Sequence, residues 1–247
     1  MTGALRIERM GYVVSALLFV SGLIHLMILF LTGGSWVGPL SLRKPATFGL
    51  SFGLTLMTIT WVTTFLRIGD RVRTRLLGVF AAACVLETAL VTLQAWRGVP
   101  SHFNVETSFD ASVTRLLAGG GVTLIAIVIA FTVYAFRQNP STPVSLRVAI
   151  QAGFVILIGS LTVGALMIAK GMTLVVNGNP QAAYATGGSL KPMHAATMHA
   201  ILILPGLAWL MSFSTWSDRR RLRVVLAATA SYLVFLALLA TIEIVNR

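Results

Sequence analysis

The chain has 247 residues, of which 56% are hydrophobic and only 11% charged, and its formal net charge is +12. So few charged residues cannot cover a water-soluble domain, in which roughly 25% of residues are charged. The apolar content also excludes intrinsic disorder, and the single cysteine excludes a disulfide scaffold. The composition therefore predicts an all-α, polytopic membrane protein.

Seven apolar stretches follow one another along the chain, and each reaches the length of roughly 20 residues that a membrane-spanning helix needs. The first follows two arginines, but its apolar run is too long for a signal peptide, so we expect it to be retained as a helix. The seven helices are expected to form one transmembrane domain over residues 1–247. They are predicted at residues 11–32, 46–66, 76–96, 116–136, 148–169, 193–213 and 224–245.

The basic residues predict how these helices are oriented. Of the 19 Lys and Arg side chains, 12 fall at the N-terminus and in the second, fourth and sixth loops, and 7 fall on the opposite side. Because basic residues favour the cytoplasmic side, the N-terminus is expected in the cytoplasm and the C-terminus outside it. The lipid bilayer of a plasma membrane then accounts for the positive charge, and a nucleic-acid partner is not expected.

The first predicted helix contains Ser21 and His25, which are four residues apart and share a face. Ionisable side chains inside a membrane are costly and are functional candidates. His25 is therefore a candidate ligand for haem b or a transition metal, or a proton carrier. The alternative is a neutral histidine that is hydrogen-bonded to a neighbouring helix.

Small and basic residues mark the second predicted helix. Lys44 at its start is a candidate for attracting an anionic solute. Gly49 and Gly53 form a GxxxG pattern, and Gly119–Gly121 lies early in the fourth predicted helix. Both glycine groups predict close helix packing.

The third predicted helix carries Glu87 near its middle and Gln94 seven residues later on the same face. A glutamate in lipid is protonated unless it is paired, so Glu87 is a candidate catalytic or proton-exchanging group. The following loop contains turn-forming residues and is expected to be ordered. As a lid it would bring catalytic His102 and substrate-binding Asn104 to a site near Gln94 and Arg97; the alternative is a surface loop.

The start of the sixth predicted helix is the densest polar segment. At about 100° per residue, His194 and His199 point about 140° apart, which is a poor arrangement for holding one ion together. Met198 shares a face with His194, and sulfur beside imidazole suits copper or haem iron; the alternative is a packing methionine. His199 is expected to face His25 as the second cofactor ligand, and Lys191 joins the candidate solute-binding residues.

All four histidines and both glutamates within the spans fall in the predicted extracytoplasmic half or in the loops beyond it. This asymmetry predicts a site that opens to that side. The first hypothesis is a haem- or metal-binding redox protein. The alternative is a proton-coupled transporter or binder of a small solute, with an anion as one option.

A third hypothesis, a metal-dependent membrane hydrolase, comes from a resemblance. Ser21 and His25, together with two later histidines, superficially resemble the seven-helix hydrolases of the alkaline ceramidase and progestin–adipoQ receptor superfamily. That resemblance implies a zinc ion held by three histidines. Here His194 and His199 are one residue further apart than the family's pair and lie on the sixth helix instead of the last. The resemblance is thus confined to these few residues, and membership is not inferred.

Overall fold

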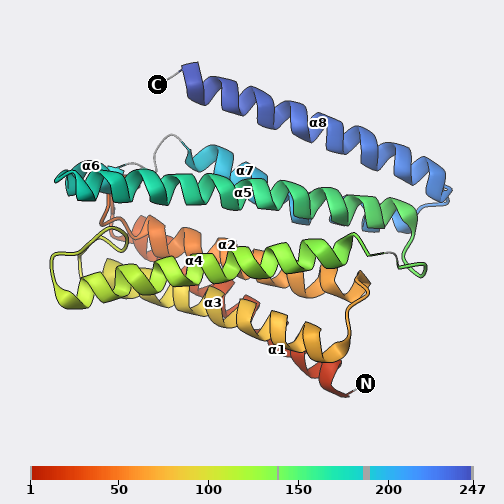
Figure 1. The fold of residues 1–247 in the computed structure, drawn as a ribbon, viewed down its shortest axis with the longest axis horizontal. Helices are drawn as coiled ribbons and strands as arrows, with labels where there is room; N and C mark the ends of the chain where they lie inside the picture. Colours follow the sequence, from red (N-terminus) through yellow and green to blue (C-terminus); the bar gives the residue numbers. More distant parts are fainter. Residues whose placement is uncertain (1, 138, 186–189, 246–247) are drawn as a thin grey trace. The chain divides into compact units, whose positions relative to one another are not determined.

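A computed structural model describes residues 2–137, 139–185 and 190–245 of the chain (Figure 1). Within these ranges it contains eight α-helices and one short 3-10 helix, η1. This confirms the predicted all-α class, and seven of the α-helices are long and apolar enough to cross a membrane, in agreement with a multi-pass protein. The helices are α1 (Thr2–Leu31), α2 (Arg43–Val62), η1 (Thr63–Phe65), α3 (Asp70–Trp96), α4 (Ser108–Ala135), α5 (Val144–Val176), α6 (Pro180–Ala185), α7 (Lys191–Ser212) and α8 (Asp218–Val245).

Each long helix matches its predicted apolar stretch, and all begin before it in a polar flank; α2 ends at Val62, four residues before the predicted end, where η1 follows. For example, α3 begins at Asp70 and α8 at Asp218, six residues before the predicted starts. An aspartate in the first turn is favourable because the amino end of a helix carries partial positive charge. The short helix α6 was not predicted, and Arg247, one of the basic residues used to predict orientation, lies outside the described residues.

The chain forms two compact units. The first unit comprises residues 1–60, 69–127 and 168–187, and the second comprises residues 61–68, 128–167 and 188–247. The first unit therefore contains α1, α2 almost to its end, α3, most of α4, the end of α5 and α6. The second contains the remaining parts of α4 and α5 together with α7 and α8. A single domain over the whole chain stays a prediction.

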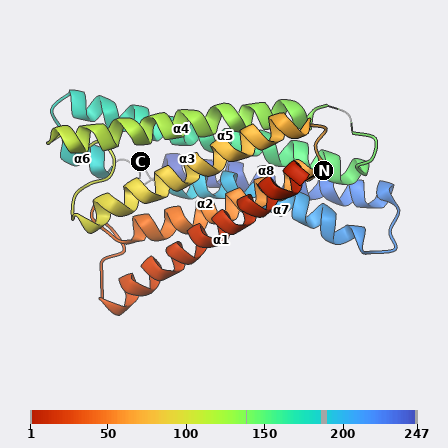
Figure 2. The same ribbon diagram turned by 90° about the horizontal axis from the view of Figure 1, so that it is seen from below.

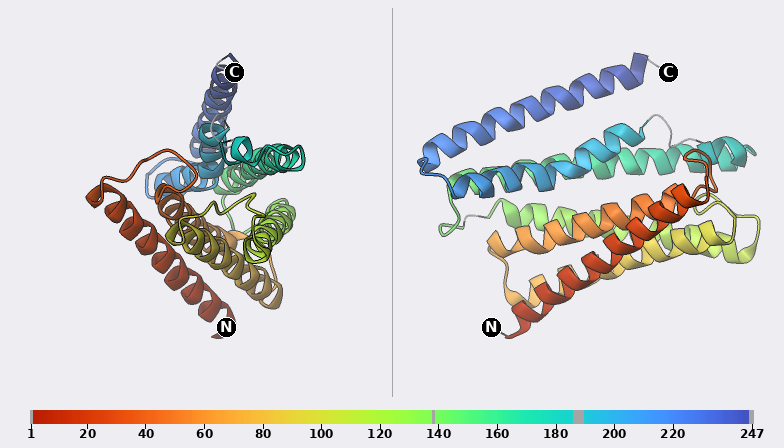
Figure 3. Two further views of the ribbon diagram at one scale, coloured as in Figure 1. Left: turned by 90° about the vertical axis from the view of Figure 1, so that its left-hand side faces the viewer. Right: turned by 180° about the vertical axis from the view of Figure 1, so that it is seen from behind.

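In the first unit, α1 runs obliquely across α2 and α3 (Figures 2 and 3). Glycines allow the backbones of α1 and α2 to meet. A Cβ atom added at Gly49 would lie 2.7 Å from the Cα atom of Gly22, and one added at Gly53 would lie 2.8 Å from the carbonyl oxygen of Ser15. Such approaches exclude any larger side chain, so the predicted packing role of Gly49 and Gly53 is confirmed.

The far end of α3 is closed by a glycine cap. Gly98 has a φ of 67°, a conformation that glycine adopts without steric cost. This turn lets the N–H groups of Gly98 and Val99 bond to the carbonyls of Ala95 and Gln94, both at 3.1 Å. These two bonds end the helix and direct the chain into the α3–α4 loop, residues 97–107.

In the second unit, α7 and α8 pack together as consecutive helices. The hydroxyl of Tyr232 on α8 donates to the carbonyl of Ala196 on α7 at 2.5 Å, and the carboxylate of Glu243 accepts from the backbone N–H of Met193 at 3.1 Å. Glu243 therefore satisfies one of the N–H groups that a helix leaves unpaired in its first turn. Its location near the end of the last span has this local structural explanation.

All five tryptophans lie at or near the ends of long helices. Aromatic side chains with one polar edge favour the boundary between lipid and water. Their positions agree with seven membrane-spanning segments that end where the sequence predicts. The residues are Trp36, Trp61, Trp96, Trp209 and Trp216.

Adding a methyl group at Gly49 tests the packing of α1 on α2. We expect G49A to lower the unfolding free energy of the detergent-solubilised protein by about 1–3 kcal/mol, because the two backbones must move apart. The matched control is G159A in α5, where an added Cβ meets no atom within 4 Å. Equal thermal stability of the two variants would contradict the proposed close contact.

Candidate functional site

The residues singled out from the sequence divide between the two units. The first unit contains His25, Lys44, Glu87, Gln94, Arg97, His102 and Asn104, and the second contains Lys191, His194, Met198 and His199. The proposed pair of His25 and His199 therefore spans two separate units, and their joint ligation of one cofactor stays a prediction. The first unit therefore contains more of the candidate residues than the second.

One face of α3 organises the polar groups of the first unit. Arg73, Glu87 and Gln94 are all buried on this face, near the beginning, the middle and the end of the helix. Arg73 forms an ion pair with Glu8 of α1. The three polar groups lie along a stripe of otherwise small and apolar side chains, so each needs a partner from a neighbouring helix.

Gln94 finds its partners at the start of α4. The Gln94 side chain is fully buried, and its Nε2 donates to Asp110 Oδ1 at 2.8 Å. Arg97 donates to the same carboxylate oxygen at 2.5 Å and also to the Gln94 side-chain carbonyl. Asp110 Oδ2 accepts from the Thr107 hydroxyl at 2.7 Å, and the Asp110 N–H donates back to that hydroxyl at 3.1 Å. This network fixes both ends of the α3–α4 loop. Within it, Arg97 is paired with the acidic side chain of Asp110.

Asp110 is the residue of this cluster that was not among the sequence candidates. The sequence nevertheless contains a pattern that includes Asp110, because Thr107 and Asp110 form the threonine-x-x-acid pattern of a helix capping box. That pattern predicts the start of α4. It does not predict that the same carboxylate also binds Gln94 and Arg97, because these lie on another helix.

The middle of the α3–α4 loop is held by aromatic and small residues of the first unit. The ring of His102 lies 5.9 Å from that of Phe48 on α2, and its Nδ1 is 2.9 Å from the Ser101 hydroxyl. Phe103 packs against Gly171 at the end of α5, where an added Cβ would lie 2.3 Å from the ring. The loop is thus fixed over the helix ends, as expected for an ordered loop, and His102 and Asn104 both belong to it.

His102 and Asn104 differ in how their polar atoms are satisfied. Burial and, to a smaller extent, the nearby charge of Lys44 lower the pKa of His102 to about 4. Asn104 is fully buried; its Oδ1 accepts from the Glu106 N–H at 3.1 Å, while its Nδ2 has no hydrogen-bond partner among the described residues. The end of the first unit therefore contains a histidine that is neutral near pH 7 and a buried amide group without a hydrogen-bond acceptor among the described residues.

Helix α6 lies close to the same loop. Burial raises the pKa of Tyr184 on α6, and the negative charges of Glu106 and Asp110 add to this effect. Figure 1 shows α6 and the α3–α4 loop at the same end of the first unit. The unpredicted helix thus belongs to the surroundings of the candidate residues.

Glu87 has the least satisfied polar group on α3. The side chain is 4% exposed, and its Oε1 atom has no hydrogen-bond partner among the described residues. It lies against α4, where a Cβ atom added at Gly120 would be 2.2 Å from Oε1. Leaving a buried polar atom unpaired costs about 1–3 kcal/mol, and more when the group is charged. Glu87 is therefore the strongest functional candidate in the first unit.

His25 is engaged at both ring nitrogens. Its Nδ1 lies 2.8 Å from the carbonyl oxygen of Ser21, and the Trp96 indole N–H donates to Nε2 at 3.0 Å. A carbonyl only accepts and an indole N–H only donates, so Nδ1 carries the proton and Nε2 is the acceptor. The structure thus agrees with the alternative of a hydrogen-bonded neutral histidine, which leaves no ring nitrogen available for a metal or haem iron.

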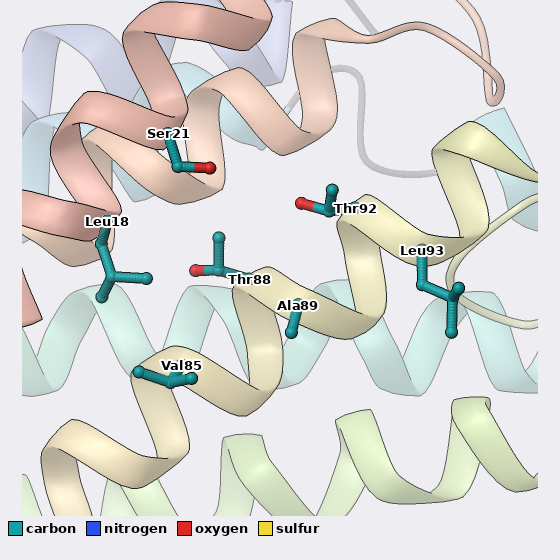
Figure 4. A pocket seen from close by; sticks show the side chains of 7 residues that line it. All are labelled: Leu18, Ser21, Val85, Thr88, Ala89, Thr92 and Leu93. Carbon is teal, nitrogen blue, oxygen red and sulfur yellow. The ribbon is translucent and has the colours of Figure 1, made fainter.

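A groove of about 410 Å³ lies between α1 and α3 (Figure 4). Hydroxyl groups of Ser21, Thr88 and Thr92 line it together with apolar side chains. The Thr88 hydroxyl donates to the Cys84 carbonyl at 2.9 Å, as threonines in helices commonly do. The candidate residues Glu87 and Gln94 are not among those that line this groove.

The histidines of the second unit have separate partners. His194 Nδ1 lies 2.9 Å from the Ser160 carbonyl oxygen, and His199 Nδ1 lies 2.6 Å from that of Ala195. Their different surroundings agree with the predicted divergence of the two side chains. In the described part of the chain, no three His, Cys, Asp or Glu side chains form a group suited to a metal ion.

The protonation of His102 predicts a pH dependence. The pKa of about 4 in the folded protein lies below the ordinary value of 6.5, so the unfolded chain binds the proton more readily. Stability is therefore present above about pH 6.5 and is lost as the pH falls towards about 4. We expect the melting temperature of the wild type to fall over this interval, because unfolding is coupled to the uptake of up to one proton at His102. H102Q should show a smaller fall, and an identical pH profile would contradict this assignment.

Comparison with known proteins adds no relative: no protein-family model matches the chain, and neither a curated protein nor a solved structure is significantly similar to it.

Proposed function

We propose that this protein binds or transports a small solute in a multi-pass membrane bundle and couples this process to protonation of Glu87. The observation that carries the proposal is the buried, unpartnered Oε1 atom of Glu87 within a helix that can span a membrane. An ionised carboxylate that has no opposite charge beside it and one oxygen unpaired is strongly disfavoured in such surroundings, so the resting side chain is expected to hold its proton. Release of that proton requires a change in its environment, which is the coupling that a proton-linked transporter needs.

The solute is expected to enter at the end of the first unit that carries the α3–α4 loop. Lys44 and the buried Asn104 Nδ2 supply a positive charge and a free amide donor, which suit a carboxylate or another small anion. Gln94 and Arg97 hold the loop through Asp110 and have a positioning role. Lys191 belongs to the second unit, and its part in solute binding stays a proposal.

The redox and hydrolase hypotheses find less support. Both need His25 as a ligand, and its two nitrogens are already used in hydrogen bonds to Ser21 and Trp96. Binding an iron or zinc ion would require breaking the bond from the Trp96 indole. The residues present therefore do not fit a haem or metal centre at His25, and no reaction step is assigned through such a group.

Chemical modification of Glu87 tests the central proposal. Dicyclohexylcarbodiimide is an apolar reagent that modifies protonated carboxyl groups in membranes. We expect it to label Glu87 in proteoliposomes near neutral pH. Labelling should decrease as the pH rises, because a smaller fraction of the carboxyl groups is then protonated. Peptide mass spectrometry measures the extent. Asp110, whose two oxygens accept three side-chain hydrogen bonds, is the internal control and should stay unlabelled.

The functional readout uses the same proteoliposomes with an entrapped pH indicator and a panel of small carboxylates. At least one carboxylate should dissipate an imposed pH gradient faster with the wild type than with E87Q. If Glu87 stays unlabelled from about pH 5 to about pH 9, a range that covers documented values for buried carboxyls, the proposed proton exchange is wrong.

The proposed opening of the site to the extracytoplasmic side depends on orientation. A phosphatase reporter that is active only outside the cytoplasm, fused after residue 247, should be active. An odd number of spans would put the two termini on opposite sides, and the distribution of basic residues favours a cytoplasmic N-terminus. The matched control is the same reporter fused within the 213–217 turn, where it should be inactive. A reporter that is inactive at the C-terminus would overturn the predicted orientation.

A further inference from the structure

We infer that Gly120 is the positioning residue for Glu87, because its lack of a side chain lets the carboxyl group lie directly against the backbone of α4. This inference rests on the proposed function in assigning Glu87 a role, and it adds a specific steric requirement on a second helix. Two independent observations support it. The first is the burial of an unpartnered Glu87 Oε1, and the second is the spacing between that atom and Gly120.

The spacing is specific to one glycine of three. An added Cβ at Gly120 would lie 2.2 Å from Glu87 Oε1 and 3.1 Å from Glu87 Cδ, both within van der Waals overlap or at its limit. At Gly119 and Gly121 an added Cβ would meet no atom within 4 Å. The three consecutive glycines therefore differ in what an added side chain would meet: only at Gly120 would it meet the carboxyl group, although the backbone N–H of Gly121 also bonds to Glu87.

Contacts on the same side of Glu87 hold α3 and α4 together next to this glycine. Val91 of α3 forms a buried apolar cluster with Val113 and Leu117 of α4. Val91 lies one turn from Glu87, and Leu117 and Val113 lie one and two turns from Gly120. Beyond it, Gln94 and Asp110 tie the same two helices together. Because α3 and α4 are fixed at this distance, a methyl group at Gly120 must displace the carboxyl or force the helices apart. Either outcome changes the environment that sets its protonation.

The test is a set of single and double variants. G120A is expected to lower the melting temperature by about 2–4 °C or more and to alter the pH profile of carbodiimide labelling at Glu87. G119A and G121A carry the same added methyl on the same helix turn. They should leave the labelling profile unchanged and keep the melting temperature at or slightly above the wild-type value, because alanine favours a helix. They control for the change in helix propensity from glycine to alanine.

Variants that remove or shorten the Glu87 side chain should relieve the destabilisation caused by G120A. E87A removes the carboxyl, so G120A should cost little in the E87A background. E87D withdraws the carboxyl by one methylene, so E87D/G120A should regain stability relative to G120A and remain open to labelling. The non-additive effect separates direct contact from general helix packing. If G120A lowers the melting temperature equally in the wild-type and E87A backgrounds, the assignment of Gly120 is wrong.

The two proposals fail in different ways. If wild-type Glu87 is never labelled but the G120A effect disappears in the E87A background, proton exchange is overturned and the steric role of Gly120 stands. If Glu87 is labelled with a pH dependence and G120A behaves like G119A and G121A, the role of Gly120 is overturned and the proposed function stands.

Discussion

The first unit depends on how the polar side chains on the buried face of α3 are satisfied. Inside a membrane-spanning bundle no bulk water is available for hydrogen bonding, so each buried polar side chain needs a hydrogen-bond or ion-pair partner within the protein. Arg73 finds Glu8 on α1, and Gln94 finds Asp110 on α4. These two contacts join α3 to a different neighbour at each end, so the polar groups fix the arrangement of helices as well as their own burial.

Glu87 is the exception on that face. Its neighbours are glycines on α4, and the structure provides no hydrogen bond for one of its carboxyl oxygens among the described residues. A protein that needed only stability would gain from an apolar residue there, because an unpaired buried polar group costs free energy. The cost is understandable if the carboxyl exchanges a proton. The adjacent satisfied network of Gln94, Arg97 and Asp110 shows that the same two helices can provide partners where structure alone requires them.

The histidines show why a residue type alone does not define a site. His25 combines burial within a span with spacing that suits a ligand, yet the Trp96 indole occupies the acceptor nitrogen that a metal would need. His194 and His199 likewise bond to backbone carbonyls near them. Histidine carries both a donor and an acceptor, so it can be retained in an apolar bundle for hydrogen bonding between and within helices. Depth in the membrane, which the sequence reveals, does not distinguish these uses.

The sequence by itself determined the number, order and approximate bounds of the spanning helices, because the length of an apolar run and the cost of burying charge are local properties. It also identified Gly49 and Gly53 as packing positions and Glu87 as the unusual acid. The tertiary structure decided which partner each polar residue meets. Trp96 beside His25, Asp110 beside Gln94 and Gly120 beside Glu87 are contacts between helices, and their partners are separated along the chain by distances that no local pattern encodes. Spacing along one helix predicts a shared face, whereas the chemistry of that face is set by the helix packed against it.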